Sequence, residues 1–96
     1  MAAYVIYQAE VTDPEQYALY REKSGPAVVA AGGEFLVRGG EVDLLEGEPP
    51  RGRTVIAKFA SMEAARAFYD GETYREARAL REGAVLANLY IVDGVD

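Results

Sequence analysis

The side chains that could do chemistry in this sequence are carboxylates, hydroxyls, amines and guanidinium groups, because the chain contains neither His nor Cys. These absences exclude a thiolate or imidazole metal site, a haem held by histidine, a cysteine nucleophile and a triad built around imidazole. We therefore expect no metal and no cofactor. A reaction that uses the chain's own groups must depend on Asp, Glu, Tyr, Lys, Arg, Ser or Thr.

Two cations are the leading candidates for a binding site. Arg38 and Lys58 each occur in a segment rich in β-branched and aromatic residues, so a strand would place them on a largely apolar surface. An apolar surface with a few polar groups is typical of a small-molecule site, and both cations suit an anionic or carbonyl-bearing ligand. The side chains expected to stack on that ligand or hydrogen-bond to it are Tyr4, Gln8, Tyr20 and Tyr90.

Length and charge restrict the partners. The chain has 96 residues, with 10 Lys and Arg against 16 Asp and Glu, which gives a net charge of −6 at pH 7. An acidic chain is poorly suited to neutralising phosphates, so we expect no nucleic-acid partner. No apolar run is long enough to span a membrane, and the N-terminus lacks the basic leader of a signal peptide. We expect the protein to be a single domain over residues 1–96, located in the cytoplasm.

Residue patterns predict the elements that position these side chains. Alternating apolar residues predict strands, and Asp13-Pro14 and Ser61 are typical helix starts. Gly25-Pro26 should kink or break the first helix, and Gly39-Gly40 predicts a two-residue hairpin turn. The expected elements are strand Ala3–Val11, a helix from Pro14 that Gly32-Gly33 ends, strands Glu34–Arg38, Glu41–Glu46 and Arg53–Phe59, a helix after Ser61, a helical piece Glu72–Glu82 and strand Leu86–Val92. This order predicts an α+β fold, the ferredoxin-like βαββαβ antiparallel sheet with its helices on one face.

The two faces of this sheet differ in polarity. One set of strand residues is almost wholly apolar and should lie under the helices: Val5, Tyr7, Ala9, Phe35, Val37, Val55, Ala57, Phe59, Leu89 and Ile91. The opposite set mixes large apolar side chains with polar ones: Tyr4, Ile6, Gln8, Leu36, Arg38, Thr54, Ile56, Lys58, Asn88, Tyr90 and Val92. In a monomer the second face would meet water, so we expect a homodimer in which two sheets pack face to face.

A longer motif carries a family resemblance. The segment from Gly32 to Gly40, together with Tyr74 and Arg81, resembles the family called domain of unknown function 1330, and the likeness extends from Tyr4 to Gly94. The resemblance implies a dimeric α+β barrel, in agreement with the homodimer inferred from the sheet. Its superfamily includes cofactor-independent monooxygenases, small lactone isomerases, haem-degrading enzymes and amino-acid-binding regulatory modules, so it implies no particular reaction.

Two functions fit the mixed face of the sheet. The first is an enzyme that needs neither metal nor cofactor and acts on a small carbonyl or aromatic acid, in a monooxygenase-like or isomerase-like reaction with Arg38 stabilising oxyanion charge. The second is a non-catalytic module that binds a small metabolite or a partner protein. A third possibility is a plain dimer interface, at whose rim Arg38 and Lys58 pair with carboxylates such as Glu34 or Glu10.

Overall fold

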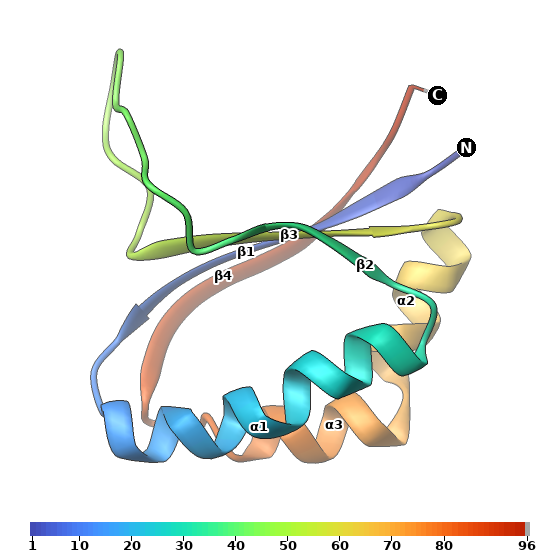
Figure 1. Cartoon of the computed structure of the whole chain (residues 1–96), viewed down its shortest axis with the longest axis horizontal. Helices are drawn as coiled ribbons and strands as arrows, with labels where there is room; N and C mark the ends of the chain where they lie inside the picture. The colour runs from blue at the N-terminus through green and yellow to red at the C-terminus, as the bar shows by residue number, and fades with distance from the viewer. Residues whose placement is uncertain (96) are drawn as a thin grey trace.

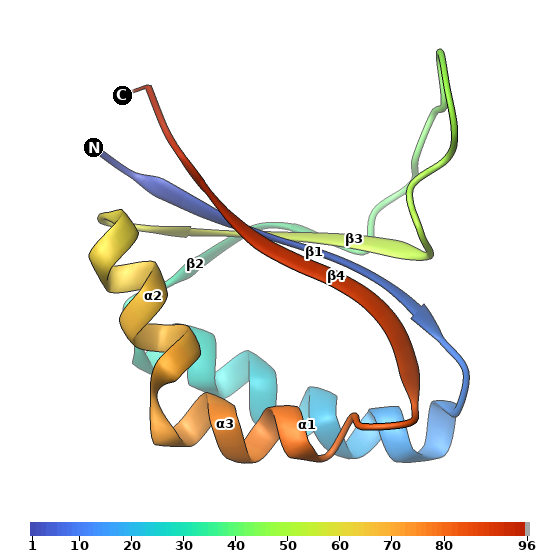
Figure 2. The same cartoon turned by 180° about the vertical axis from the view of Figure 1, so that it is seen from behind.

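The fold is a curved sheet with helices on one side. A computed structural model describes residues 1–95, with the elements β1 (Ala3–Val11), α1 (Pro14–Ala30), β2 (Glu34–Arg38), β3 (Arg53–Phe59), α2 (Met62–Asp70), α3 (Glu72–Ala79) and β4 (Val85–Asp93). The strands form one antiparallel sheet in the order β2-β3-β1-β4. All three helices lie on the same face of the sheet (Figures 1 and 2). This is the predicted ferredoxin-like α+β fold.

Side-chain caps fix where the helices begin. Asp13 accepts a hydrogen bond from the backbone N–H of Gln16 at 3.2 Å, and Ser61 accepts one from Ala64 at 3.0 Å. Each cap satisfies a backbone donor that the first helical turn leaves without a partner. The Gln16 side chain donates to the carbonyl of Leu80 at 2.7 Å, so it ties the start of α1 to the end of α3.

Helix α1 continues through its proline. The predicted break near Lys23 to Gly25 is wrong, because hydrogen-bonded helix extends over Pro14–Ala30 with Pro26 inside it. A residue before proline is usually excluded from helix by a clash between its Cβ and the proline ring, and Gly25 has no Cβ. Pro26 itself lies on the exposed side of the helix. The continuous helix therefore carries residues on both sides of Pro26 over the sheet.

The predicted hairpin at Gly39-Gly40 is also wrong. A two-residue type I′ turn needs a positive φ at both central residues, and only Gly39 has one, at 76°. Residues 41–46 form no strand, and β2 pairs with β3. The Gly39 N–H donates to the Thr54 carbonyl at 2.8 Å, after which residues 39–52 form a loop. That loop rises on the side of the sheet away from the helices (Figures 1 and 2).

A β-bulge in β2 changes the face of Arg38. Phe35 pairs with Ala57, but Val37 pairs with Ile56 and Arg38 with Val55, so β2 contains one extra residue. Such a shift moves the residues after it to the other face of the sheet. The prediction that Arg38 lies opposite the helices is therefore wrong: Arg38 shares the helix-covered face with Val55, and Val37 joins the open face.

Candidate anion-binding site

A small cavity lies between α1 and the helix-covered face of the sheet. Its volume is about 50 Å³, and apolar side chains such as Val5, Val28, Val55 and Leu89 form much of its wall. The polar side chains in its lining are three arginines, four tyrosines and one serine: Arg21, Arg38, Arg53, Tyr7, Tyr17, Tyr20, Tyr74 and Ser24. We call it the arginine cavity.

Arg38 reaches the arginine cavity because of the bulge. Its guanidinium lies over the Phe35 ring, 4.2 Å from the ring centroid, which is a cation–π contact. The same guanidinium rests against Gly25 of α1, where a Cβ would come within 2.7 Å of one of its terminal nitrogens. The Arg38 side chain thus bridges from the edge of the sheet to the helix, where Gly25 leaves room for the guanidinium.

Arg53 stands beside Arg38 at the start of β3. One of its terminal nitrogens donates to the Arg38 carbonyl at 3.3 Å, and this bond fixes the side chain next to the cavity. Its Nε is buried and has no hydrogen-bond partner within residues 1–95. A buried donor without an acceptor costs free energy, and such a group is often explained by a water or ligand that completes the site.

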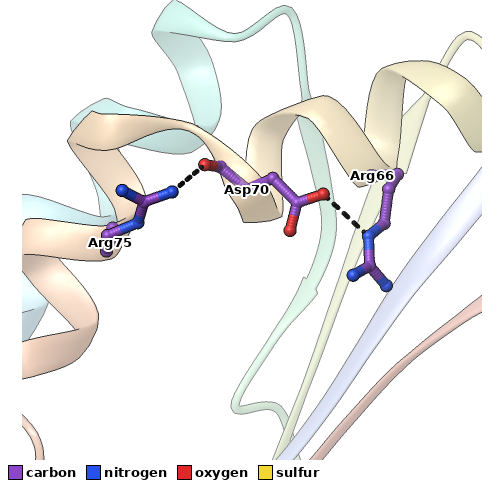
Figure 3. A network of polar contacts seen from close by, with 3 residues as sticks. All are labelled: Arg66, Asp70 and Arg75. Atoms are coloured by element: carbon purple, nitrogen blue, oxygen red, sulfur yellow. Dashed lines mark hydrogen bonds and ion pairs between the residues drawn. The ribbon is translucent and has the colours of Figure 1, made fainter.

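The cavity has positive charge in an acidic protein. Three arginines line it, of which Arg21 and Arg38 are exposed, whereas no Asp or Glu of residues 1–95 lines it. None of these three arginines forms an ion pair with a carboxylate in the part of the chain that is described. Outside the cavity, one arginine of residues 1–95 has an acidic partner: on α2, Arg66 pairs with Asp70 at 2.9 Å (Figure 3).

Arginines outside the cavity are of two kinds: Nη1 of Arg78 and Nε of Arg81 are also buried without a partner in residues 1–95, whereas Arg66 and Arg75 have acceptors. Where α2 meets α3, Arg75 donates to the Asp70 carbonyl at 3.1 Å, so Arg66 and Arg75 both have an acceptor on Asp70 (Figure 3). An anion bound among guanidinium groups would supply the acceptors that the cavity lacks. Within residues 1–95 no group of three or more Asp and Glu side chains is arranged to hold a metal ion.

The inner part of the site is a cluster of buried tyrosines. Tyr17 donates to the Tyr7 hydroxyl at 3.2 Å, and the hydroxyls of Tyr20 and Tyr74 are 2.8 Å apart, with either as donor. All four rings are between 3% and 5% exposed. The Arg81 guanidinium lies 5.4 Å from the Tyr7 ring centroid and 5.5 Å from that of Tyr20. These contacts connect β1, α1 and α3 around the cavity.

Burial keeps two of these tyrosines neutral. Burial raises the pKa of Tyr20 far above its usual value, and the neighbouring Tyr74 raises it further. Burial and the hydrogen bond from Tyr17 raise the pKa of Tyr7 in the same direction, while the charge of Arg81 opposes the shift. Both phenols therefore remain protonated at neutral pH, where each has a hydrogen that it can donate to a ligand but does not accept a proton as a base.

Comparison with known proteins identifies the family. The model of the family described as domain of unknown function (DUF1330) matches residues 2–95. The chain belongs to this family. No curated protein matches the sequence. DUF1330 membership confirms the resemblance predicted from the Gly32–Gly40 segment.

Solved structures support the fold of this DUF1330 chain. RPA0582, a protein of unknown function from Rhodopseudomonas palustris, is 23% identical, with a TM-score of 0.76 over 99% of this chain and 83% of that one. Methylated RPA0582 gives a TM-score of 0.74 at 23% identity, over 99% and 82% of the two chains. A proposed antibiotic biosynthesis monooxygenase from Nitrosomonas europaea is 11% identical, with a TM-score of 0.59 over 97% and 90%. At these identities the likeness shows the fold alone.

The predicted site residues of this DUF1330 chain separate into two groups. Arg38 and Tyr20 line the arginine cavity. The other four lie on the open face of the sheet: Tyr4, Gln8, Lys58 and Tyr90. Tyr4 pairs with Lys58 across β1 and β3, and Glu34 pairs with Lys58 from β2, so this group surrounds a different surface. The sheet itself separates the two groups.

Some of the site was missed at the sequence level. The sequence pattern assigns Tyr7 to the core and places Arg53 at a strand start beside the proline loop, yet both line the arginine cavity. The signal for Arg53 was present, because alternation puts it on the same face as Val55 and Ala57. The sequence places Tyr74 in the family motif and on a helical stripe with Arg78 and Arg81, but the pairing of its hydroxyl with Tyr20 depends on how α1 and α3 pack.

Proposed function

We propose that the protein binds a small organic anion in the arginine cavity. The observation that carries the proposal is the concentration there of Arg21, Arg38 and Arg53, with no carboxylate of residues 1–95 in the lining, in a chain of net charge −6. Guanidinium groups in a partly desolvated site bind carboxylates through charge-assisted hydrogen bonds. The buried Nε of Arg53 is one donor that such a ligand would satisfy.

The size of the cavity favours a short ligand. Its volume of about 50 Å³ is well below the roughly 300–1,000 Å³ typical of sites for drug-sized molecules. At about 10–15 Å³ for each water-sized group, it holds roughly three to five such groups. A short-chain acid fits when its carboxylate lies at the mouth beside Arg38, which is exposed. A polycyclic aromatic acid would require α1 to move away from the sheet.

Non-catalytic binding is the function that the geometry supports best. An isomerase-like reaction needs a base, and within residues 1–95 no carboxylate lines the cavity. The raised pKa of Tyr20 and of Tyr7 makes both phenols unsuited to that role at neutral pH. The site is equipped to hold an anion but not to remove a proton from it.

A small enzyme is the second candidate. Neutral phenols beside guanidinium groups are the kind of donors that stabilise negative charge developing on a carbonyl or enol oxygen. The likeness to the proposed monooxygenase from Nitrosomonas europaea also supports this candidate. In a monooxygenase-like reaction, Arg38 and Tyr20 would stabilise an oxyanion formed after the substrate has lost its proton to solvent. Turnover of a bound keto or aromatic acid, measured as oxygen consumption, would distinguish this candidate from simple binding.

Calorimetric titration with acetate and benzoate tests the binding proposal. Acetate should bind once per chain, and Arg38→Gln and Arg53→Gln should each weaken it by about tenfold or more, as expected for the loss of a charged hydrogen bond. Arg66→Gln, which removes an arginine of α2 far from the lining, is the matched control and should bind normally. If neither acid binds at millimolar concentration, or if all three variants bind alike, the proposal is wrong.

We also propose that the open face of the sheet forms a homodimer. Five of the large hydrophobic residues that are more than a third exposed lie on this face: Leu36, Val37, Leu86, Tyr90 and Val92. Three more lie in the loop 39–52, which rises on the same side: Val42, Leu44 and Leu45. A second sheet packed against this face would remove them from water. No helix of residues 1–95 is long and apolar enough to cross a membrane.

A further inference from the structure

The hydrogen-bonding groups of the arginine cavity are mostly donors. A guanidinium group has five N–H donors and no acceptor, and three such groups line the cavity. Only one donor of the three has a protein acceptor within residues 1–95, which is the bond from Arg53 to the Arg38 carbonyl. Arg21 and Arg38 are exposed, so water can accept from them, but the Nε of Arg53 is buried without an acceptor. A ligand with several acceptors would satisfy these donors together.

The tyrosines contribute two further donors. Tyr17 gives its hydroxyl hydrogen to Tyr7, which leaves the hydrogen of Tyr7 without an acceptor in the described chain. In the Tyr20–Tyr74 pair only one hydroxyl can donate to the other, so one hydrogen again remains. All four side chains line the cavity. Donors of two kinds thus meet there, cationic ones from α1, β2 and β3 and neutral ones from β1, α1 and α3.

We propose that the ligand is a short-chain 2-oxo acid. Its carboxylate would lie between the guanidinium groups of Arg38 and Arg53, and its keto oxygen would accept the hydrogen that Tyr7 or the Tyr20–Tyr74 pair leaves over. Every polar atom of a 2-oxo acid is an acceptor, which matches the donors of the cavity. This inference rests on the proposed anion binding and adds the chemical class of the ligand.

Related acids with the same skeleton fit less well. A 2-amino acid brings an ammonium group, which would lie among three guanidinium groups without a carboxylate to receive it. A 2-hydroxy acid can offer its oxygen as an acceptor, but its own hydrogen then needs a partner, and the hydroxyl of Ser24 is the main one in the lining. The order of affinity should therefore be keto acid first, hydroxy acid second and amino acid last.

Calorimetric titration with pyruvate, lactate, alanine and acetate tests this order. The first three share a three-carbon skeleton and a carboxylate and differ only at the second carbon. Pyruvate should bind about threefold to tenfold more tightly than lactate, the range expected for one neutral hydrogen bond, and alanine should bind least. Tyr20→Phe and Tyr7→Phe should each weaken the binding of pyruvate more than that of acetate, and so reduce the advantage of pyruvate over acetate.

A matched variant and the acetate titration separate the possible outcomes. Tyr69→Phe removes a tyrosine of α2 that does not line the cavity, so it should keep the preference for pyruvate. If acetate, lactate and pyruvate bind equally, the anion site stands and the 2-oxo acid inference is overturned. The inference also fails if alanine binds as tightly as pyruvate. If the unmodified protein binds no acid at all, the proposed function fails first.

Discussion

In a Pro26→Ala background, replacing Gly25 with alanine should weaken anion binding without disturbing the fold. The added Cβ would lie 2.7 Å from a terminal nitrogen of Arg38, whereas ordinary contact begins near 3.4 Å. The nitrogen is the far end of a flexible side chain, so the guanidinium can move away instead of α1. Gly25→Ala therefore displaces the Arg38 guanidinium from the arginine cavity but leaves its charge on the protein.

The size of the effect follows from that displacement. A hydrogen bond to a charged group contributes roughly 1.5–3 kcal/mol, so losing its geometry lowers affinity by about 10-fold to 150-fold at most. Stability should change in the opposite direction, because alanine inside a helix is favoured over glycine by about 0.5–1 kcal/mol. Pro26 complicates this gain, since a Cβ before proline disfavours helix.

A Pro26→Ala background removes that complication. In it, Gly25→Ala should raise the melting temperature by about 2–8 °C for a chain of this size, while acetate binding still falls. The assay pairs thermal unfolding with calorimetric titration of the single and double variants. Adding Arg38→Gln should abolish the effect of Gly25→Ala on affinity. If Gly25→Ala leaves affinity unchanged, or lowers it equally without Arg38, the contact does not position the guanidinium.

Three further changes test other parts of the molecule. Tyr20→Phe should lower the free energy of unfolding by about 1–3 kcal/mol, because the buried Tyr74 hydroxyl loses its partner. Adding Tyr74→Phe should lower this free energy further by a smaller amount, because it removes the hydroxyl that was left without a partner. Stability should be flat through neutral pH and fall above about pH 10, where the unfolded chain ionises tyrosines that the fold keeps protonated. Tyr90→Lys, on the open face, should convert the homodimer to monomer.

Each of these has its own measurement. Urea unfolding of the single and double variants gives the tyrosine coupling, and additive losses would show that the two hydroxyls do not interact. The raised pKa of Tyr7 and of Tyr20 costs stability of about 1.4 kcal/mol per pH unit for each group in the alkaline range. If all seven tyrosines ionise while the circular dichroism spectrum stays native, that account is wrong.

Sedimentation equilibrium measures the assembly. Leu19→Lys is the matched control for Tyr90→Lys, because Leu19 and Tyr90 are both 45% exposed and Leu19 lies on α1 away from the open face. The control should remain dimeric. A monomer for the unmodified protein at micromolar concentration would contradict the homodimer.

Most of the fold follows from local patterns in the sequence. β1, β2 and β3 have the predicted ends, because each is a short alternating run between strong turn or capping residues. Asp13 and Ser61 cap α1 and α2 as predicted, since a capping bond depends only on residues three apart. The hairpin failed because glycine permits a positive φ without requiring one. Gly40 does not adopt it, and the chain leaves the sheet as a loop.

The site was harder to predict than the fold. Phe35, Leu36 and Val37 are all apolar, so the pattern before Arg38 fits either register of the strand. Alternation therefore gives no sign of the bulge. One extra residue decides whether Arg38 faces the helices or the open side. The contacts with Gly25 and Arg53 join elements distant in sequence. Such contacts depend on tertiary packing, which no local pattern encodes.

The most direct test of the arginine cavity is a crystal structure of the protein soaked in bromide. Bromide is a compact anion, and its anomalous scattering locates it without assumptions about ligand identity. The account predicts an anomalous peak in the cavity, within hydrogen-bonding distance of Arg38 and Arg53. A cavity that holds only water, while bromide occupies sites elsewhere on the surface, would contradict it.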